Sequence, residues 1–200
     1  MVIDKTCRTD DRETIDPISR GRQEPPAEDE TRFDPSRGPE MRKRRLSEPV
    51  SILAADQGAI DIGRVALLTY SSEDPQHPLD HLIDGSRGRG ATRWESGRPD
   101  ATEQIELQFD HPQKISRLVY EVEECVEDRT QQVRVEVSVD GGRTYRQMLA
   151  QDYTFSAHGA TFQHEDLRIE VAGVTHLRLT VIPNKGGSGV ATLTSLRIFA

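Results

Sequence analysis

Basic side chains that could hold an anion gather in two stretches of the sequence. The first contains Arg87, Arg89, Arg93 and Arg98, and the second is the glycine-rich run KGGSG, which begins at Lys185. Guanidinium groups offer forked N–H donors that suit carboxylates and phosphates, and glycines let backbone N–H groups come close to a ligand. We therefore predict a ligand site at Arg87, Arg89, Arg93 and Lys185 for an acidic sugar, a phosphate or an acidic protein segment. Pairing of these cations with acidic side chains of the same chain is the alternative, and it stays open here.

Carboxylates form a third cluster, composed of Glu121, Glu123, Glu124, Glu127 and Asp128. Paired carboxylates can serve as general acid and base. A run along an exposed strand and the loop after it is more typical of a solvated face or a partner-binding patch. The sequence contains no glycine-rich phosphate loop, no G-x-S-x-G elbow and no HExxH motif. We therefore predict that the chain is not an enzyme and has no catalytic residues.

Two histidines, His77 and His81, stand four positions apart, a spacing that can share a metal ion on a helix. Pro78 interrupts the pair, and no third ligand is evident. We interpret both as surface histidines.

Composition limits the classes of partner. The chain has 200 residues, of which 34% are hydrophobic and 30% charged, and its formal net charge is -8. Residues 63–200 hold fifteen Lys/Arg and twenty Asp/Glu, so nucleic acid is disfavoured as a partner. No apolar run reaches the roughly 18 residues of a membrane span, and the polar N-terminus shows no secretory signal. Because Cys7 and Cys125 are the only cysteines and lie far apart, we predict an intracellular, cytoplasmic protein without a disulfide framework.

The first 62 residues differ in character from the rest. Residues 1–40 hold five prolines among Asp, Glu and Arg, without the apolar period of a helix or a strand. Such a segment buries too little apolar surface to offset its ordering entropy, so we predict a largely disordered tail at 1–62 and a folded domain at 63–200. The basic run at 42–45 is interpreted as a solvated charge run, with a localisation signal or an acidic-partner contact as alternatives. Met41 is an alternative start of translation.

The domain shows short strand patterns separated by turn residues. Ile105, Leu107 and Phe109 share one face of a strand over 104–109, and the four valines of 131–139 are expected to point inward. The sequence DGG at 140–142 predicts a β-hairpin. The remaining candidates are Arg64–Tyr70, Ile115–Glu123, Thr144–Leu149, Leu167–Val171, His176–Ile182 and Ala191–Phe199, with weaker ones near 153–155 and 161–162. About eight antiparallel strands with one apolar face each predict an all-β sandwich or barrel.

In this order and spacing, several segments resemble the discoidin family, also called coagulation-factor C-type or galactose-binding-like. They are SS at 71–72, LIDG at 82–85, TRW at 92–94, IELQF at 105–109, VRVEVSVDGG at 133–142, LRLTV at 177–181 and the closing strand at 191–199. The resemblance covers almost the whole domain and implies a jelly-roll β-sandwich. The SSED…HP…L variant at 71–79 is similar to two intracellular members, the N-terminal domain of the single-strand-break-repair scaffold protein and the small discoidin-like intraflagellar transport subunit. The cysteines that extracellular relatives usually carry at each end of the domain are missing.

The resemblance also implies roles for particular residues. It makes Trp94 a packing residue of the sandwich wall rather than a sugar-stacking platform, and it places ligands at the inter-strand loops at the end of the barrel. Many members hold Ca²⁺, for which Asp84 and Thr92 would supply ligands here. Calcium takes about six to eight oxygens, but the late glutamate of the family is missing from 191–195. We therefore favour a domain without calcium or any other cofactor.

Two functions follow from this sequence, both of a non-catalytic binding module. The first is an intracellular protein-interaction or adaptor domain, favoured by the missing signal peptide and the intracellular-type motif. The alternative is a carbohydrate-binding module, the commonest use of the family. DNA-strand-break binding and a hydrolase accessory role rank below both. The expected partner is a protein or a glycan, and no membrane association is expected.

Overall fold

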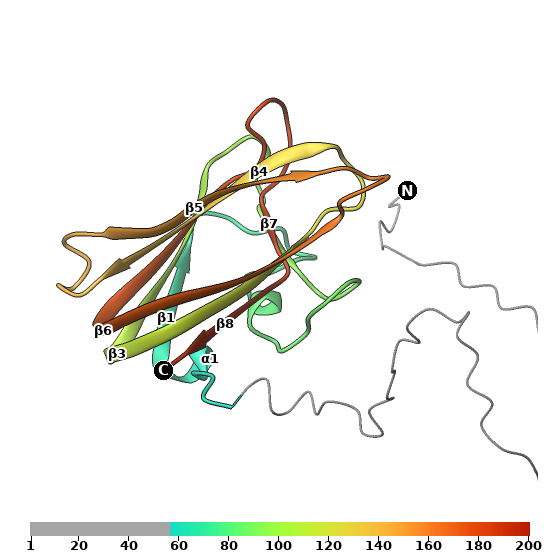
Figure 1. The fold of residues 1–200 in the computed structure, drawn as a ribbon. Helices are drawn as coiled ribbons and strands as arrows, with labels where there is room; N and C mark the ends of the chain where they lie inside the picture. Colours follow the sequence, from blue (N-terminus) through green and yellow to red (C-terminus); the bar gives the residue numbers. More distant parts are fainter. Residues whose placement is uncertain (1–56) are drawn as a thin grey trace, which may run out of the picture. The chain divides into compact units, whose positions relative to one another are not determined.

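β-Strands make up most of residues 57–200, which the computed structural model describes (Figure 1). The elements are α1 (Ile62–Val65), β1 (Ala66–Tyr70), the 3₁₀ helix η2 (Leu79–Leu82), β2 (Trp94–Glu95), β3 (Glu103–Glu123), β4 (Arg129–Ser138), β5 (Arg146–Phe155), β6 (Phe162–Ile182), β7 (Thr192–Leu193) and β8 (Ser195–Phe199). The strands of one sheet follow the order β1-β3-β6-β4-β5, with β8 on the other half of β3, and β2 pairs with β7. Every pairing is antiparallel. The predicted all-β antiparallel sandwich is confirmed.

Two long strands, β3 and β6, build both layers of the sandwich. Each runs for 21 residues, and the register between them shifts between Gln108 and Arg117. β3 pairs with β1 before these shifts and with β8 after them. Such irregularities bend strands, and Figure 1 shows β3 and β6 turning the corner together. The sequence predicted separate strands at 104–109 and 115–123 and at 167–171 and 176–182. In the structure each pair is one continuous strand, because the strand bends at β-bulges and its pairing continues on both sides of the bend.

The β4–β5 hairpin forms at the predicted turn. Gly141 and Gly142 have φ values of 76° and 80°, a left-handed conformation that glycine adopts without steric cost. Of the four valines expected to point inward, Val139 does not, because its exposed fraction is 57%. β4 ends at Ser138, whose hydroxyl accepts the N–H of Gly142. Val139 therefore lies in the turn, where the alternation of a strand no longer applies.

The core lies between the two layers. Trp94 is fully buried, and its indole N–H donates to the carbonyl of Ser72 over 3.2 Å, which confirms its predicted packing role. Tyr120 of β3 and Tyr153 of β5 meet edge to face across the core, with ring centroids 6.3 Å apart. These aromatic contacts join the layers.

The segment just before β1 belongs to the same packed unit. The N–H of Ile60 donates to the carbonyl of Ile198 over 2.7 Å, and Ala200 donates to Gly58. Ile62 is buried in the core. The predicted boundary at residue 62 therefore leaves out residues that pack on the domain. The predictions for the basic run at 42–45 and for Met41 lie outside the described residues.

Two further expectations concern the setting of the protein. Among residues 57–200, no helix is both long enough and apolar enough to cross a membrane. Cys125, in the loop between β3 and β4, is disulfide-bonded. The prediction that concerns Cys7 lies outside the described residues.

Candidate functional site

The arginine-containing loop at 84–92 is fixed to β3 by two buried carboxylates. Glu121 accepts the N–H of Gly88 and Glu123 accepts the N–H of Gly90, both over 2.8 Å. Each glutamate is only 5% exposed, so these charge-assisted bonds form where water competes little. These two hydrogen bonds therefore fix the loop against the half of β3 that contains Glu121 and Glu123.

Glu121 has two more partners. The hydroxyl of Ser195 donates to it over 3.1 Å, and His164 Nδ1 lies 3.0 Å from its other oxygen. Burial by itself raises the pKa of Glu121, but the bonds from Gly88, His164 and Ser195 outweigh it, and the net pKa is lowered. Glu121 is thus held as a carboxylate. The interpretation of this acidic run as a solvated face is wrong for Glu121 and Glu123.

Most of the cations proposed as ligands have partners within the domain. Arg93 Nε lies 2.5 Å from Glu95 Oε1, and Lys185 Nζ lies 2.7 Å from Asp152 Oδ2. The pairing alternative therefore describes Arg93 and Lys185, although neither pairs with the acidic run at 121–128.

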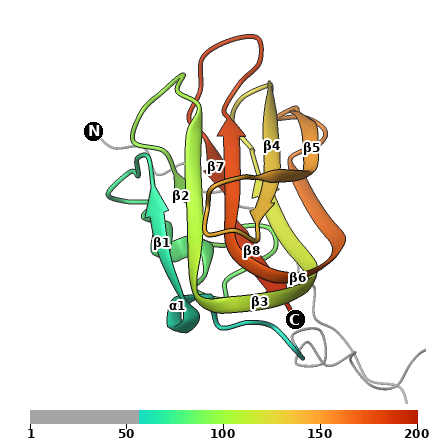
Figure 2. The same cartoon turned by 90° about the vertical axis from the view of Figure 1, so that its left-hand side faces the viewer.

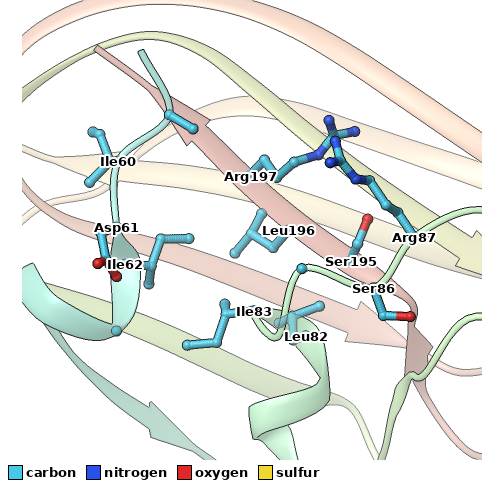
Figure 3. A pocket seen from close by; sticks show the side chains of 13 residues that line it. Ile60, Asp61, Ile62, Leu82, Ile83, Ser86, Arg87, Ser195, Leu196 and Arg197 are labelled. Carbon is cyan, nitrogen blue, oxygen red and sulfur yellow. The ribbon is translucent and has the colours of Figure 1, made fainter. Parts of the chain in front are cut away.

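Arg89 makes a different kind of contact. Its guanidinium donates to the hydroxyl of Thr161 and stands 5.4 Å from the ring centroid of Phe162. The residue itself is exposed. Arg87 instead lines a pocket beside β8 (Figure 3), so the structure does not gather the four predicted cations into one group.

Four loops meet at one end of the sandwich, here called the loop end: 86–92, 124–128, 156–161 and 183–191. The loop 124–128 connects the end of β3 to the start of β4. β6 begins at Phe162, which pairs with Glu123 of β3, and ends at Ile182, which pairs with Gln132 of β4. Arg89 ties the first loop to Thr161, and the N–H of Lys185 donates to Thr130. Figure 2 shows the loop that follows β6 at the opposite end of the molecule from α1. Arg89 is therefore tied to the start of β6 and Lys185 to the start of β4, which follows the acidic loop 124–128.

A buried arginine that the sequence reading missed organises this end. Arg129 is 4% exposed and donates to the carbonyls of Pro183 and Val190 and to the hydroxyl of Thr192. Its Nε lies 2.7 Å from Glu124 Oε2. Burial lowers the pKa of Arg129. The negative charge of Glu124 raises it by less, so the net pKa is lowered. The only sequence signal was a lone cation at the start of a valine-rich strand, which does not reveal carbonyl partners far along the chain.

Asp84 and Thr92, the residues suggested for calcium, do come together. The Thr92 hydroxyl and the Ser86 N–H donate to the two carboxylate oxygens of Asp84, each over 2.7 Å. Within residues 57–200, no three His, Cys, Asp or Glu side chains are grouped so that they could hold a metal ion. Both oxygens of Asp84 thus already accept hydrogen bonds from the loop itself. The prediction that the domain holds no calcium stays untested.

The two histidines do not form a pair. His77 Nδ1 lies 3.3 Å from both Asp74 and Glu95, while His81 Nδ1 lies 3.0 Å from the carbonyl of Arg93. Each ring is thus held by its own neighbours in the segment that leads into β2.

The two-layered antiparallel sandwich with its loop end has the architecture of the F5/8 type of domain. The F5/8 type C domain family matches residues 68–194, and the chain belongs to this family. A search of curated proteins finds no match. The predicted nearness to the two intracellular members gains no support from these comparisons.

Solved structures with the same fold include modules from Clostridium perfringens. A CBM32 module of GH89 in complex with GlcNAc-α-1,4-galactose is 14% identical, with a TM-score of 0.53 over 71% of this chain and 94% of that chain. The family 32 module of NanJ, in complex with galactose, is 15% identical, with a TM-score of 0.51 over 72% and 98%. A second GH89 module, in complex with GalNAc-β-1,3-galactose, is 19% identical, with a TM-score of 0.50 over 71% and 99%. At these identities the likeness establishes the fold alone.

Proposed function

We propose that this domain is a carbohydrate-binding module. The observation that supports the proposal is its fold, which is shared with several modules solved in complex with galactose-containing glycans. This favours the alternative drawn from the sequence over the adaptor role.

The loop end offers the chemistry that a sugar needs. Sugars bind through hydroxyls that both donate and accept hydrogen bonds, and through apolar ring faces that pack on aromatic rings. Arg89 and Lys185 are exposed donors, Glu127 and Asp128 are exposed acceptors, and the partly buried ring of Phe162 lies beneath Arg89. Trp94 cannot serve as a platform because it is fully buried. We propose that a glycan lies across the loop 124–128, between Arg89 and Lys185.

A glycan array with the full 200-residue chain tests the proposal. We expect binding to galactose-containing glycans, weakened by Arg89→Ala and by Lys185→Ala. The exposed ion pair of Lys185 with Asp152 contributes about 0–1 kcal/mol to stability, and Arg89 is likewise exposed, so the melting temperature should hardly change. Lys114→Ala is the matched control, because Lys114 is exposed and lies at the bend of β3, away from the loop end.

Two results would contradict parts of this proposal. Failure to bind any glycan on the array would remove the carbohydrate function. Binding that is equally strong in the Arg89→Ala, Lys185→Ala and Lys114→Ala variants would move the site away from the loop end.

A further inference from the structure

A pocket of about 250 Å³ opens beside β8, and neither Arg89 nor Lys185 lines it (Figure 3). Three segments form its walls: residues 59–63 around the start of α1, residues 82–87 after η2, and residues 195–197 of β8. We call it the β8-edge pocket. Hydrogen bonds fix these segments to one another. The N–H of Ile60 donates to the carbonyl of Ile198 in β8, and the carboxylate of Glu121 accepts from the N–H of Gly88 and the hydroxyl of Ser195.

The walls of the β8-edge pocket are mostly aliphatic. Ile60, Ile62, Leu82, Ile83 and Leu196 line it, and no aromatic ring does. A hydroxyl-rich sugar ring would bury several hydroxyls against these side chains without hydrogen-bond partners, which is unfavourable. An aliphatic group would lose only contact with water. The walls therefore select a hydrocarbon rather than a sugar.

One end of the pocket is polar and cationic. Arg87, Ser195 and Arg197 line the pocket, and Figure 3 draws all three on the side of the view away from Asp61. Arg197 also lies 3.8 Å from Glu121, and a guanidinium has five N–H donors, so it can serve a second carboxylate as well. Asp61 lies at the opposite end of the pocket. Its carboxylate would repel a second negative charge on a ligand.

We propose that the β8-edge pocket binds a small aliphatic monocarboxylate. The hydrocarbon part lies against Ile60, Ile62 and Ile83, and the carboxylate reaches Arg87 and Arg197, whose forked donors match its geometry. A pocket of about 250 Å³ lies below the range of roughly 300–1,000 Å³ typical of drug-sized ligands. The ligand is therefore a short chain. This proposal does not depend on glycan binding, because the two surfaces share neither Arg89 nor Lys185.

Titration of the full chain with hexanoate, followed by isothermal calorimetry, tests the proposal. We expect saturable binding with one ligand per chain, about fourfold tighter for each added methylene from butanoate to hexanoate. Hexanol, which lacks the charge, and adipate, which carries a second carboxylate toward Asp61, should both bind more weakly.

Two variants locate the site. Arg87→Gln should weaken hexanoate binding roughly tenfold, as expected for the loss of a charge-assisted hydrogen bond. Ile83→Trp, which fills the pocket from a partly exposed position, should abolish hexanoate binding while the melting temperature persists. Lys114→Gln is the control and should bind hexanoate normally. Absence of saturable binding, or binding unchanged in both Arg87→Gln and Ile83→Trp, would overturn the proposal.

Discussion

The carboxylate of Glu121 accepts a hydrogen bond of 2.8 Å from the backbone N–H of Gly88, 33 positions earlier in the chain. Glu123 repeats this relationship with Gly90 at the same separation and distance. Two neighbouring glutamates of one strand thus hold two glycines of one loop. A bound cation can order a loop by contacting its backbone carbonyls. In this domain the buried carboxylates of Glu121 and Glu123 order the loop by accepting hydrogen bonds from its backbone N–H groups.

Replacing Glu121 by Gln should destabilise the domain. The amide can still accept one bond, but the charge that strengthens the bonds to Gly88 and Ser195 is lost, at a cost of about 1.5–3 kcal/mol. Urea unfolding measures the loss, and hydrogen exchange at Gly88 shows whether the loop has opened. Glu127→Gln, an exposed glutamate of the same acidic run, should change stability by less than about 0.5 kcal/mol. Equal effects of the two substitutions would contradict the anchoring role.

The same carboxylate should make stability depend on pH. Burial raises the pKa of Glu121, but the bonds from Gly88, His164 and Ser195 outweigh it and lower the pKa below its usual 4.5. Its stabilisation is therefore present above pH 4.5 and is lost as the pH falls through the lower folded pKa. The difference in unfolding free energy between wild type and Glu121→Gln should be largest near neutral pH and shrink in acid. If this difference in unfolding free energy grew in acid instead, the pKa of Glu121 would be raised in the folded state, which would contradict the prediction.

Trp94→Ala should cost about 3–5 kcal/mol, the usual range for truncating a buried large aromatic side chain. The indole is fully buried and donates to the carbonyl of Ser72, so both packing and a hydrogen bond are lost. Chemical denaturation measures the change. Tyr70→Ala provides the comparison because Tyr70 is 45% exposed, and its loss should cost less than about 1 kcal/mol. Unchanged stability of Trp94→Ala together with lost glycan binding would restore the surface-platform reading.

Arg129→Met should loosen the loop end. The substitution leaves Glu124 without its buried partner and removes the donors to Pro183, Val190 and Thr192. Removing one member of a buried ion pair typically costs about 3–5 kcal/mol. Hydrogen exchange should rise over 183–191 more than over the sheet. Arg143→Met, at an exposed turn position, serves as the control. Exchange that stays unchanged over 183–191 would show that Arg129 does not hold this loop.

Two shortened chains should differ in stability. A chain of residues 57–200 keeps the hydrogen bonds from Ile60 to Ile198 and from Ala200 to Gly58, whereas a chain of residues 63–200 loses both, together with the buried side chain of Ile62. Loss of one buried isoleucine by itself costs about 2–5 kcal/mol. Thermal unfolding of the two chains measures the difference. Identical melting temperatures would return the domain boundary to residue 63.

The sequence by itself determined which residues face the core within each strand. Val133, Val135 and Val137 are buried because side chains alternate between the faces of a strand, and this alternation is local. The hairpin at 140–142 is equally local, since Gly141 and Gly142 supply the φ values that the turn needs. The order of such segments also indicated the family.

Only the tertiary structure decided where the polar side chains find their partners. Glu121 and Glu123 share the outward face of β3, and local patterning assigns such glutamates to solvent. They are buried because the loop at 84–92 folds over that face and supplies N–H donors. Arg129 is buried for a similar reason, since its carbonyl partners at Pro183 and Val190 come from a loop 54 and 61 positions away. A side chain's hydrogen-bond partners depend on long-range packing, which no periodicity of the sequence records.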